Sequence, residues 1–170
     1  MSGLKGAFIA MTVIIIASNY LVMFPINDWL TWGAFPYPVS LLVTELTNRQ
    51  YGPKKARTVV YWGFALAVFF SIWLATPKIA LASGAAFLVS QLLDISVFNR
   101  LRRAPWWTAP IIASFAASLI DSSIFWNLAF YQENVPLLQW ALGDTGIKLL
   151  IDVAMLTPFR FAMNRARMIS

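Results

Sequence analysis

Cysteine and histidine are both absent from the 170-residue sequence. Their absence excludes disulfides, thiol chemistry, haem ligation by histidine and the usual zinc sites. The sequence also contains no GxxxxGK[ST] segment, so it has no phosphate-binding loop of the P-loop type. No nucleophile motif is present either. Together these absences predict a protein that is not an enzyme and that carries no metal or other cofactor.

Charged residues are scarce. They make up 12% of the sequence, compared with about 25% in soluble domains, while hydrophobic residues make up 59% and the mean hydropathy is +0.68. This composition predicts an all-α, polytopic integral membrane protein. The net charge of +6 does not indicate a nucleic-acid partner. Apart from Lys78 and Lys148, the 13 Lys and Arg residues lie in short segments between or beside apolar runs.

Six apolar segments are candidates for membrane spans, since a helix needs about 20 apolar residues to cross the hydrocarbon core. The second segment is the least regular, because Pro36 and Pro38 interrupt its start. No linker separates the segments, so we predict a single transmembrane domain over residues 1–170. The predicted spans cover about residues 4–24, 32–51, 59–76, 79–99, 106–131 and 137–160.

The basic residues predict the orientation of these spans, because cytoplasmic loops carry an excess of Lys and Arg. Basic and non-basic connections alternate along the chain, and the non-basic ones hold only Asp28, Lys78 and Glu133 as charged residues. This alternation predicts six spans with both termini in the cytoplasm. The basic positions are Lys5, Arg49, Lys54, Lys55, Arg57, Arg100, Arg102, Arg103, Arg160, Arg165 and Arg167.

Polar residues inside the predicted spans are the strongest indication of a functional site. A charge near the centre of a span costs about 2.5–3.5 kcal/mol on insertion scales, so it must face the bundle interior or a wet cavity. These residues are Glu45, Asp94, Asp121, Lys148 and Asp152, together with the amides Asn19, Asn48, Gln91 and Asn127.

Helical spacing places several of these residues on shared faces. Gln91, Asp94 and Phe98 fall on one stripe of the fourth span, and Asp121 and Phe125 fall on one stripe of the fifth. The simplest arrangement that satisfies all the polar groups is a cavity where the helices converge.

Lys148 lies four residues after Asp144 and four before Asp152, so it can pair with either carboxylate. Such a pair can be purely structural or part of a site, and the spacing leaves both interpretations open.

Local partners are also available for two other acids. Asp94 can interact with the basic loop that begins at Arg100, and Glu45 can pair with Arg49 at i+4. Asp121 has no basic neighbour in the sequence, which makes it the hardest acid to explain structurally. We therefore predict Asp121 to be the principal functional residue.

Five segments, in order along nearly the whole chain, closely resemble the vitamin uptake transporter family, and within it the bacterial queuosine precursor transporters. The resemblance implies a six-helix, multi-pass protein of the bacterial inner membrane that imports 7-cyano-7-deazaguanine or its aminomethyl relative. The segments are SNYLVMFPI (18–26), TWGAFPYPVSLLVTELTNRQYGPKKAR (31–57), QLLDISVFNRLRR (91–103), SLIDSSIFWNLAFY (118–131) and GIKLLIDVAM (146–155).

The implied ligand suits the polar residues of the spans. A deazaguanine offers a ring N–H and an exocyclic amine that one carboxylate can accept together, and a carbonyl that needs a donor such as an amide N–H. Aromatic faces add stacking worth about 1–3 kcal/mol per base. We expect Asp94 and Asp121 to flank the base. The predicted substrate-binding residues are Asn19, Trp32, Glu45, Gln91, Asp94, Phe98, Asp121, Phe125 and Lys148.

The sequence leaves the transport mechanism open. Helices can rock around the site with hinges at Pro36 and Pro38, and entry can be proton-coupled or followed by metabolic trapping. The chain can also be the substrate-binding membrane subunit of an ATPase-driven vitamin transporter. The expected partners are the small-molecule substrate and membrane lipids, with a homo-oligomer left open and no nucleic acid.

Overall fold

The computed structural model describes residues 2–21, 23–28, 30–74 and 76–169. In this part of the chain the fold is all-α, as predicted, and an isolated bridge between Pro25 and Thr31 is the only strand-like pairing. The elements are α1 (Ser2–Leu21), the short 3-10 helix η1 (Trp32–Ala34), α2 (Pro36–Tyr51), α3 (Pro53–Leu74), α4 (Pro77–Arg100), α5 (Thr108–Phe130) and α6 (Leu137–Ile169).

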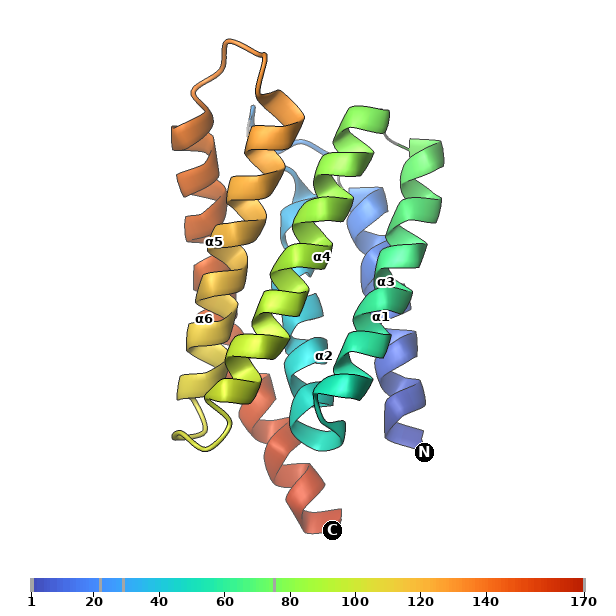
Figure 1. Cartoon of the computed structure of the whole chain (residues 1–170), viewed down its shortest axis with the longest axis vertical. Helices are drawn as coiled ribbons and strands as arrows, with labels where there is room; N and C mark the ends of the chain where they lie inside the picture. Colours follow the sequence, from blue (N-terminus) through green and yellow to red (C-terminus); the bar gives the residue numbers. More distant parts are fainter. Residues whose placement is uncertain (1, 22, 29, 75, 170) are drawn as a thin grey trace.

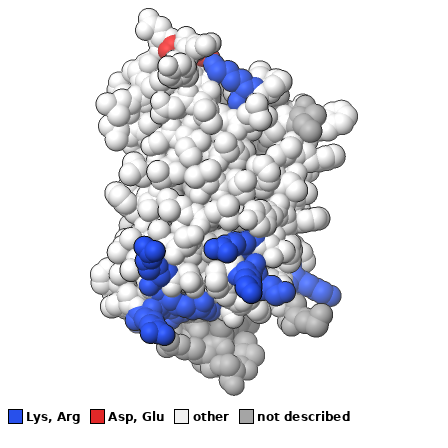
Figure 2. Space-filling view, viewed as in Figure 1, with Lys and Arg blue, Asp and Glu red and all other residues white. Residues whose placement is uncertain are grey.

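The helices form one elongated bundle in which chain neighbours run in opposite directions (Figure 1). The central helix is α2, which contacts α1, α3, α4, α5 and α6. Helices α4 and α5 pack along each other in front of it. Both chain ends lie at the lower end of the bundle in this view. We call it the basic end because Lys and Arg side chains gather there (Figure 2).

Prolines mark where several helices begin. Pro36, Pro53 and Pro77 are the first residues of their helices, where the missing N–H is tolerated because it has no intrahelical partner. The predicted second span therefore divides into η1 and a helix that starts at Pro36. Pro38 follows within the first turn of α2, so both prolines lie at the start of the helix, and the hinge at these residues stays a prediction.

Two connections differ from the sequence-based expectation. Gly52, with φ of 84°, is the single residue between α2 and α3, and this left-handed conformation favours glycine. Lys54, Lys55 and Arg57 therefore lie on the first turns of α3 rather than in a loop. At the other end of the chain, α6 continues beyond residue 160 through the positions of Arg165 and Arg167, whose side chains lie outside the described residues.

Three helices in the described part are long and apolar enough to cross a membrane by length and composition: Gly3–Leu21, Pro77–Arg100 and Thr108–Phe130. Helix α2, with 16 residues, is shorter than these three, and α6 holds Asp144, Lys148 and Asp152 in its buried face. In α6, the polar residues that single out a functional site thus also weaken the hydropathy signal of the helix that holds them.

Charge is distributed unevenly along the bundle (Figure 2). Lys and Arg side chains gather at the end where both termini lie, around the ends of α1, α2, α3 and α4. At the opposite end the exposed residues Lys78 and Glu133 form a surface ion pair at 3.5 Å. This polarity follows the alternation of basic and non-basic connections in the sequence.

Two apolar clusters fill the interior. The first joins α1, α3 and α4 through residues such as Met11, Val60 and Phe87. The second lies near the basic end, where Phe98 and Phe159 meet edge to face with ring centroids 6.1 Å apart. There the guanidinium groups of Arg49 and Arg102 each donate to the other residue's backbone carbonyl, which ties α2 to the α4–α5 connection. These contacts pack α2, α4, α5 and α6 against one another at the basic end.

Candidate functional site

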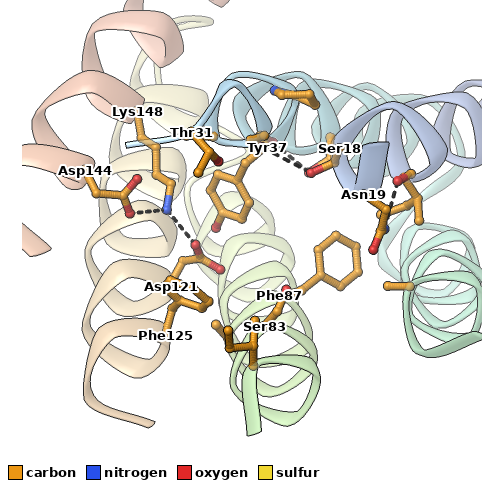
Figure 3. A pocket seen from close by; sticks show the side chains of 18 of the residues that line it. Ser18, Asn19, Thr31, Tyr37, Ser83, Phe87, Asp121, Phe125, Asp144 and Lys148 are labelled. Atoms are coloured by element: carbon orange, nitrogen blue, oxygen red, sulfur yellow. Dashed lines mark hydrogen bonds and ion pairs between the residues drawn. The ribbon is translucent and has the colours of Figure 1, made fainter. Parts of the chain in front are cut away.

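A cavity of about 370 Å3 lies in the half of the bundle away from the basic end. Its walls come from the second half of α1, the α1–α2 connection, and the ends of α2, α4, α5 and α6 that meet there. The exposed residue Asp28 is part of the lining, so the cavity reaches the surface at this end. Figure 3 shows side chains from several helices converging on it.

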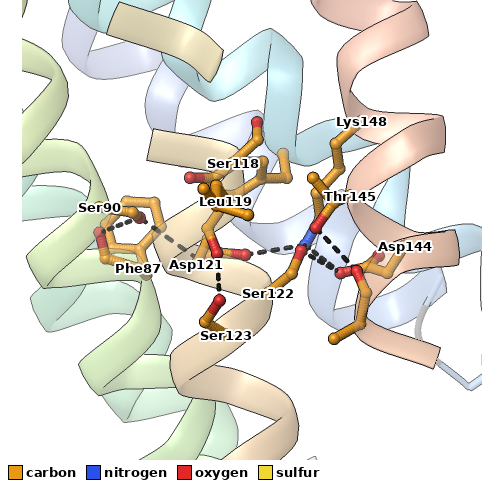
Figure 4. Close-up of polar contacts among 12 residues, drawn as sticks. Phe87, Ser90, Ser118, Leu119, Asp121, Ser122, Ser123, Asp144, Thr145 and Lys148 are labelled. Atoms are coloured by element: carbon orange, nitrogen blue, oxygen red, sulfur yellow. Dashed lines mark hydrogen bonds and ion pairs between the residues drawn. The ribbon is translucent and has the colours of Figure 1, made fainter. Parts of the chain in front are cut away.

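One wall of the cavity is a row of charged groups centred on Lys148. Its Nζ lies 2.8 Å from Oδ2 of Asp121 and 2.5 Å from Oδ2 of Asp144, and it donates to Oγ of Ser122 at 3.2 Å. The Ser122 hydroxyl donates in turn to Asp144 at 2.7 Å (Figure 4). The lysine and both aspartates are buried, so each charge depends on the others for compensation.

Asp121 keeps part of its hydrogen-bonding capacity. Its Oδ1 accepts only a long bond of 3.3 Å from the Ser90 hydroxyl, while Oδ2 is held by Lys148. An ionised carboxylate offers about four lone-pair sites, so Asp121 can accept further donors from a ligand. Asp121 thus lines the cavity, and its partner, which the sequence did not reveal, is Lys148 on the next helix, while its part in substrate binding stays a prediction.

The second wall is aromatic. Phe125, Trp126 and Phe130 of α5 line the cavity and contact one another, with Trp126 and Phe130 stacked at a centroid distance of 5.2 Å. Phe87 of α4 and Tyr37 of α2 add two more rings, and Lys148 Nζ lies 4.9 Å from the centroid of the Tyr37 ring. A flat apolar ligand can be held between such faces.

Two hydrogen-bond donors on lining residues have no acceptor. The buried indole Nε1 of Trp126 has no partner. The Tyr37 hydroxyl, which points toward Asp121 in Figure 3, lies near the Ser90 hydroxyl but has no hydrogen-bond partner. Buried donors are normally paired, and leaving one unpaired costs about 1–3 kcal/mol. These two groups therefore indicate that the site is completed by a ligand or a water.

Four of the nine predicted substrate-binding residues line this cavity: Asn19, Asp121, Phe125 and Lys148. Asn19 lies across the cavity from the charged row and donates its amide N–H to the carbonyl of Ile15 at 2.9 Å. For Lys148, the predicted pairing with Asp144 is confirmed, whereas no ion pair with Asp152 is found among the described residues.

Gln91 does not reach the cavity. Its side chain is fully buried between α4 and α2, where Nε2 donates to Ser40 Oγ and Oε1 accepts from Thr44 Oγ1, both at 2.7 Å. Both ends of the amide are thus used to join two helices. Ser40 itself lines the cavity, so Gln91 supports the lining from behind.

Glu45 and Asp94 are buried deeper toward the basic end and also lie outside the cavity lining. Glu45 accepts a hydrogen bond from Ser114 at 2.8 Å, and the ion pair with Arg49 predicted as an alternative is not among those described. Both carboxylate oxygens of Asp94 lack a donor, so an interaction with Arg100 does not satisfy them.

The two remaining candidates are aromatic. Phe98 is packed into the apolar cluster near the basic end, and Trp32 is half exposed on η1 against Phe35. Neither lines the cavity. Their part in substrate binding stays a prediction.

Several residues that line the cavity are not among the predicted substrate-binding residues, although the sequence offers Tyr37 and Trp126 as aromatic faces for stacking. Tyr37 and Trp126 have unpaired donors, and Asp144 shares the lysine with Asp121. Asp144 lies four residues before Lys148, but the same spacing made Asp152 an equally possible ion-pair partner of the lysine. Nothing in the sequence distinguishes the donors of Tyr37 and Trp126 from those of other aromatics near span ends.

Comparison with known proteins places the chain among transporters. A family model described as "Putative vitamin uptake transporter" matches residues 31–76 and 69–163. A "Probable queuosine precursor transporter" of Haemophilus influenzae is 34% identical, with 85% of this chain and 79% of that protein aligned. The "Queuosine precursor transporter" of Escherichia coli is 32% identical, with 86% and 79% aligned. No solved structure matches the chain significantly.

Proposed function

The chain belongs to the vitamin uptake transporter family, and on this premise we propose that it imports a queuosine precursor, 7-cyano-7-deazaguanine or its aminomethyl relative. The family consists of transporters and not of enzymes. The observation that supports the proposal most strongly is the cavity, which combines a lysine-bound pair of aspartates with an aromatic wall.

The cavity has a suitable size and chemistry for such a base. Its volume of about 370 Å3 falls in the range of about 300–1,000 Å3 typical of small-molecule sites. The ring N–H and exocyclic amine of the base donate to the Asp121 carboxylate, which Lys148 holds in place. The ring stacks on Phe125, and the unpaired donors of Tyr37 and Trp126 serve its carbonyl edge.

The proposed function also requires a particular orientation of the helices in the membrane. All six α-helices cross the bacterial inner membrane, with the basic end and both termini in the cytoplasm. The cavity then opens outward, and the packed layer around Phe98 and Phe159 closes the cytoplasmic side. Import requires the helices to rearrange so that this layer opens while the outer mouth closes.

The Asp121→Asn variant tests the proposed substrate contact. The amide keeps the size of the side chain but presents an N–H to the donor edge of the base, so uptake should be abolished with normal membrane abundance. The readout is queuosine in the tRNA of a cell unable to make the precursor and supplied with it. Glu133→Gln, an exposed carboxyl outside the cavity, is the matched control and should leave tRNA modification unchanged. Full modification with Asp121→Asn would refute the assignment.

A further inference from the structure

Three carboxyl groups lie together between the cavity and the basic end, apart from the substrate site. Glu45 of α2, Asp94 of α4 and Asp152 of α6 are 3%, 0% and 9% exposed. They lie close enough to act on one another electrostatically. The ion pairs in the described part of the chain include none of them, so this region holds three acids without a directly bound cation.

The carboxyl group of Asp94 is the feature that needs an explanation. Both of its oxygens are buried without a donor, and the carboxyl group of Glu45 lies near enough to act on it electrostatically. Two ionised carboxylates offer each other only acceptors, whereas one proton converts the contact into an O–H···O hydrogen bond. Oδ1 of Asp152 and Oδ1 of Asn48 on the neighbouring helices are also buried without a donor. A proton on one of these carboxyl groups supplies a donor that no side chain in the described part of the chain provides.

Hydrogen-bonding side chains connect this cluster with the cavity. On α4, Asp94 lies one turn beyond Gln91, whose amide is bonded to the cavity residue Ser40. On α5, Ser118 lies one turn before the cavity lining and donates to Asp152 at 2.8 Å. A proton that enters the cavity from outside thus has polar groups to follow on two helices.

No ion pair of the described residues involves Glu45 or Asp94, and the charge that acts on both is that of Asp152. Lys148 acts electrostatically on Asp152, but its ammonium group is held by Asp121 and Asp144. Helix α5 presents the hydroxyls of Ser114 and Ser118. The charged side chains of α1 and α3, which pack on α2 and α4, are exposed at the basic end: Lys5, Lys54, Lys55 and Arg57. The described residues also contain no group of acids suited to a metal ion.

We propose that Glu45, Asp94 and Asp152 form a proton-binding site that couples substrate import to proton entry, an inference that rests on the proposed transport function. The outward-open cavity admits the substrate and the proton from the same side. With the proton bound, α2, α4 and α6 carry less uncompensated charge through the apolar interior as they rearrange. When the layer around Phe98 opens, the proton leaves to the cytoplasm with the substrate.

Transport by the purified full-length chain in liposomes tests this coupling. With the lumen more alkaline than the outside by about one pH unit, one proton per substrate supports accumulation of labelled 7-cyano-7-deazaguanine by about tenfold. Asp94→Asn and Glu45→Gln should lower the accumulation to simple equilibration, while calorimetric binding and exchange without a gradient persist. Glu133→Gln is the carboxyl-to-amide control and should keep all three activities.

A pH-sensitive dye inside the liposomes gives a second measurement that needs no variant. Addition of substrate outside the wild-type protein, at equal pH on both sides, should acidify the lumen. An unchanged lumen pH, or accumulation driven by a sodium gradient at equal pH, would overturn the proton site. Loss of binding by Asp94→Asn would overturn it in favour of the direct base contact predicted from the sequence. Absence of exchange by the wild type would overturn the transport function and this inference with it.

Discussion

At the scale of single residues, the charge balance of the cavity depends on Lys148. Its ammonium group is bonded to two buried carboxylates, and removing one partner of a buried ion pair costs about 3–5 kcal/mol because the other charge remains uncompensated. Lys148→Met should therefore lower thermal stability in detergent and abolish substrate binding. Adding Asp144→Asn should restore part of the stability, since one uncompensated carboxylate is removed.

The surface pair Lys78–Glu133 provides the matched control. Its side chains are 46% and 51% exposed, so the pair contributes no more than about 1 kcal/mol, and Lys78→Met should leave the melting temperature nearly unchanged. Equal melting temperatures for Lys148→Met and Lys78→Met would show that the buried row does not hold the site together.

Which polar residues share a cavity was only partly predictable at this scale. Spacing placed Gln91, Asp94 and Phe98 on one stripe, but a stripe does not specify the helix that it faces. Gln91 meets hydroxyls of α2, Asp94 meets Glu45, and Phe98 packs into an apolar cluster. A helix about 36 Å long, from 24 residues at about 1.5 Å each, passes through several environments, so one face can be polar, acidic and apolar in turn.

At the scale of helices, the contact of α1 with α3 depends on Gly63. A Cβ added there would lie 2.8 Å from Cγ of the fully buried Met11 and 3.4 Å from Cζ of Phe87. Gly63→Ala should therefore overpack the interface and destabilise the protein by about 1–3 kcal/mol in detergent unfolding.

Gly6 on α1 is the control for this substitution, because no atom lies within 4 Å of its added Cβ. Gly6→Ala should be neutral or stabilising by up to about 1 kcal/mol through helix propensity. If Gly63→Ala had the same free energy of unfolding as Gly6→Ala, the close packing of α1 against α3 would not depend on a glycine at position 63.

Helix positions were more predictable than helix ends. Apolar length identified each helix, but Gly52 shortens the α2–α3 connection to one residue, and so the basic residues Lys54 and Lys55 become helical. The sequence-based prediction placed basic residues in loops. Backbone hydrogen bonding, however, can extend a helix beyond its apolar segment into the neighbouring basic residues. Helix α6 also runs to Ile169, although Pro158 lies inside it, so its end could not be predicted from a helix-breaking residue.

At the scale of the whole molecule, the absence of cysteine makes the proposed orientation directly testable. Lys55→Cys lies at the basic end, and Asn134→Cys lies in the connection between α5 and α6 at the opposite end. A membrane-impermeant maleimide should label Asn134→Cys in intact spheroplasts and Lys55→Cys only after the membrane is permeabilised. The reverse pattern would invert the orientation, and labelling of both in intact spheroplasts would contradict the six-span arrangement.

In the proposed function, the cavity at one end of the bundle, the packed basic end and the buried acids belong to one conformation of an importer. The measurement that tests this most directly is exchange of labelled 7-cyano-7-deazaguanine across liposomes that contain only the purified chain. Saturable exchange that is lost in Asp121→Asn and retained in Glu133→Gln is the predicted result. A folded wild-type protein that binds the base but exchanges none would contradict it and would favour a binding subunit that depends on a separate ATPase.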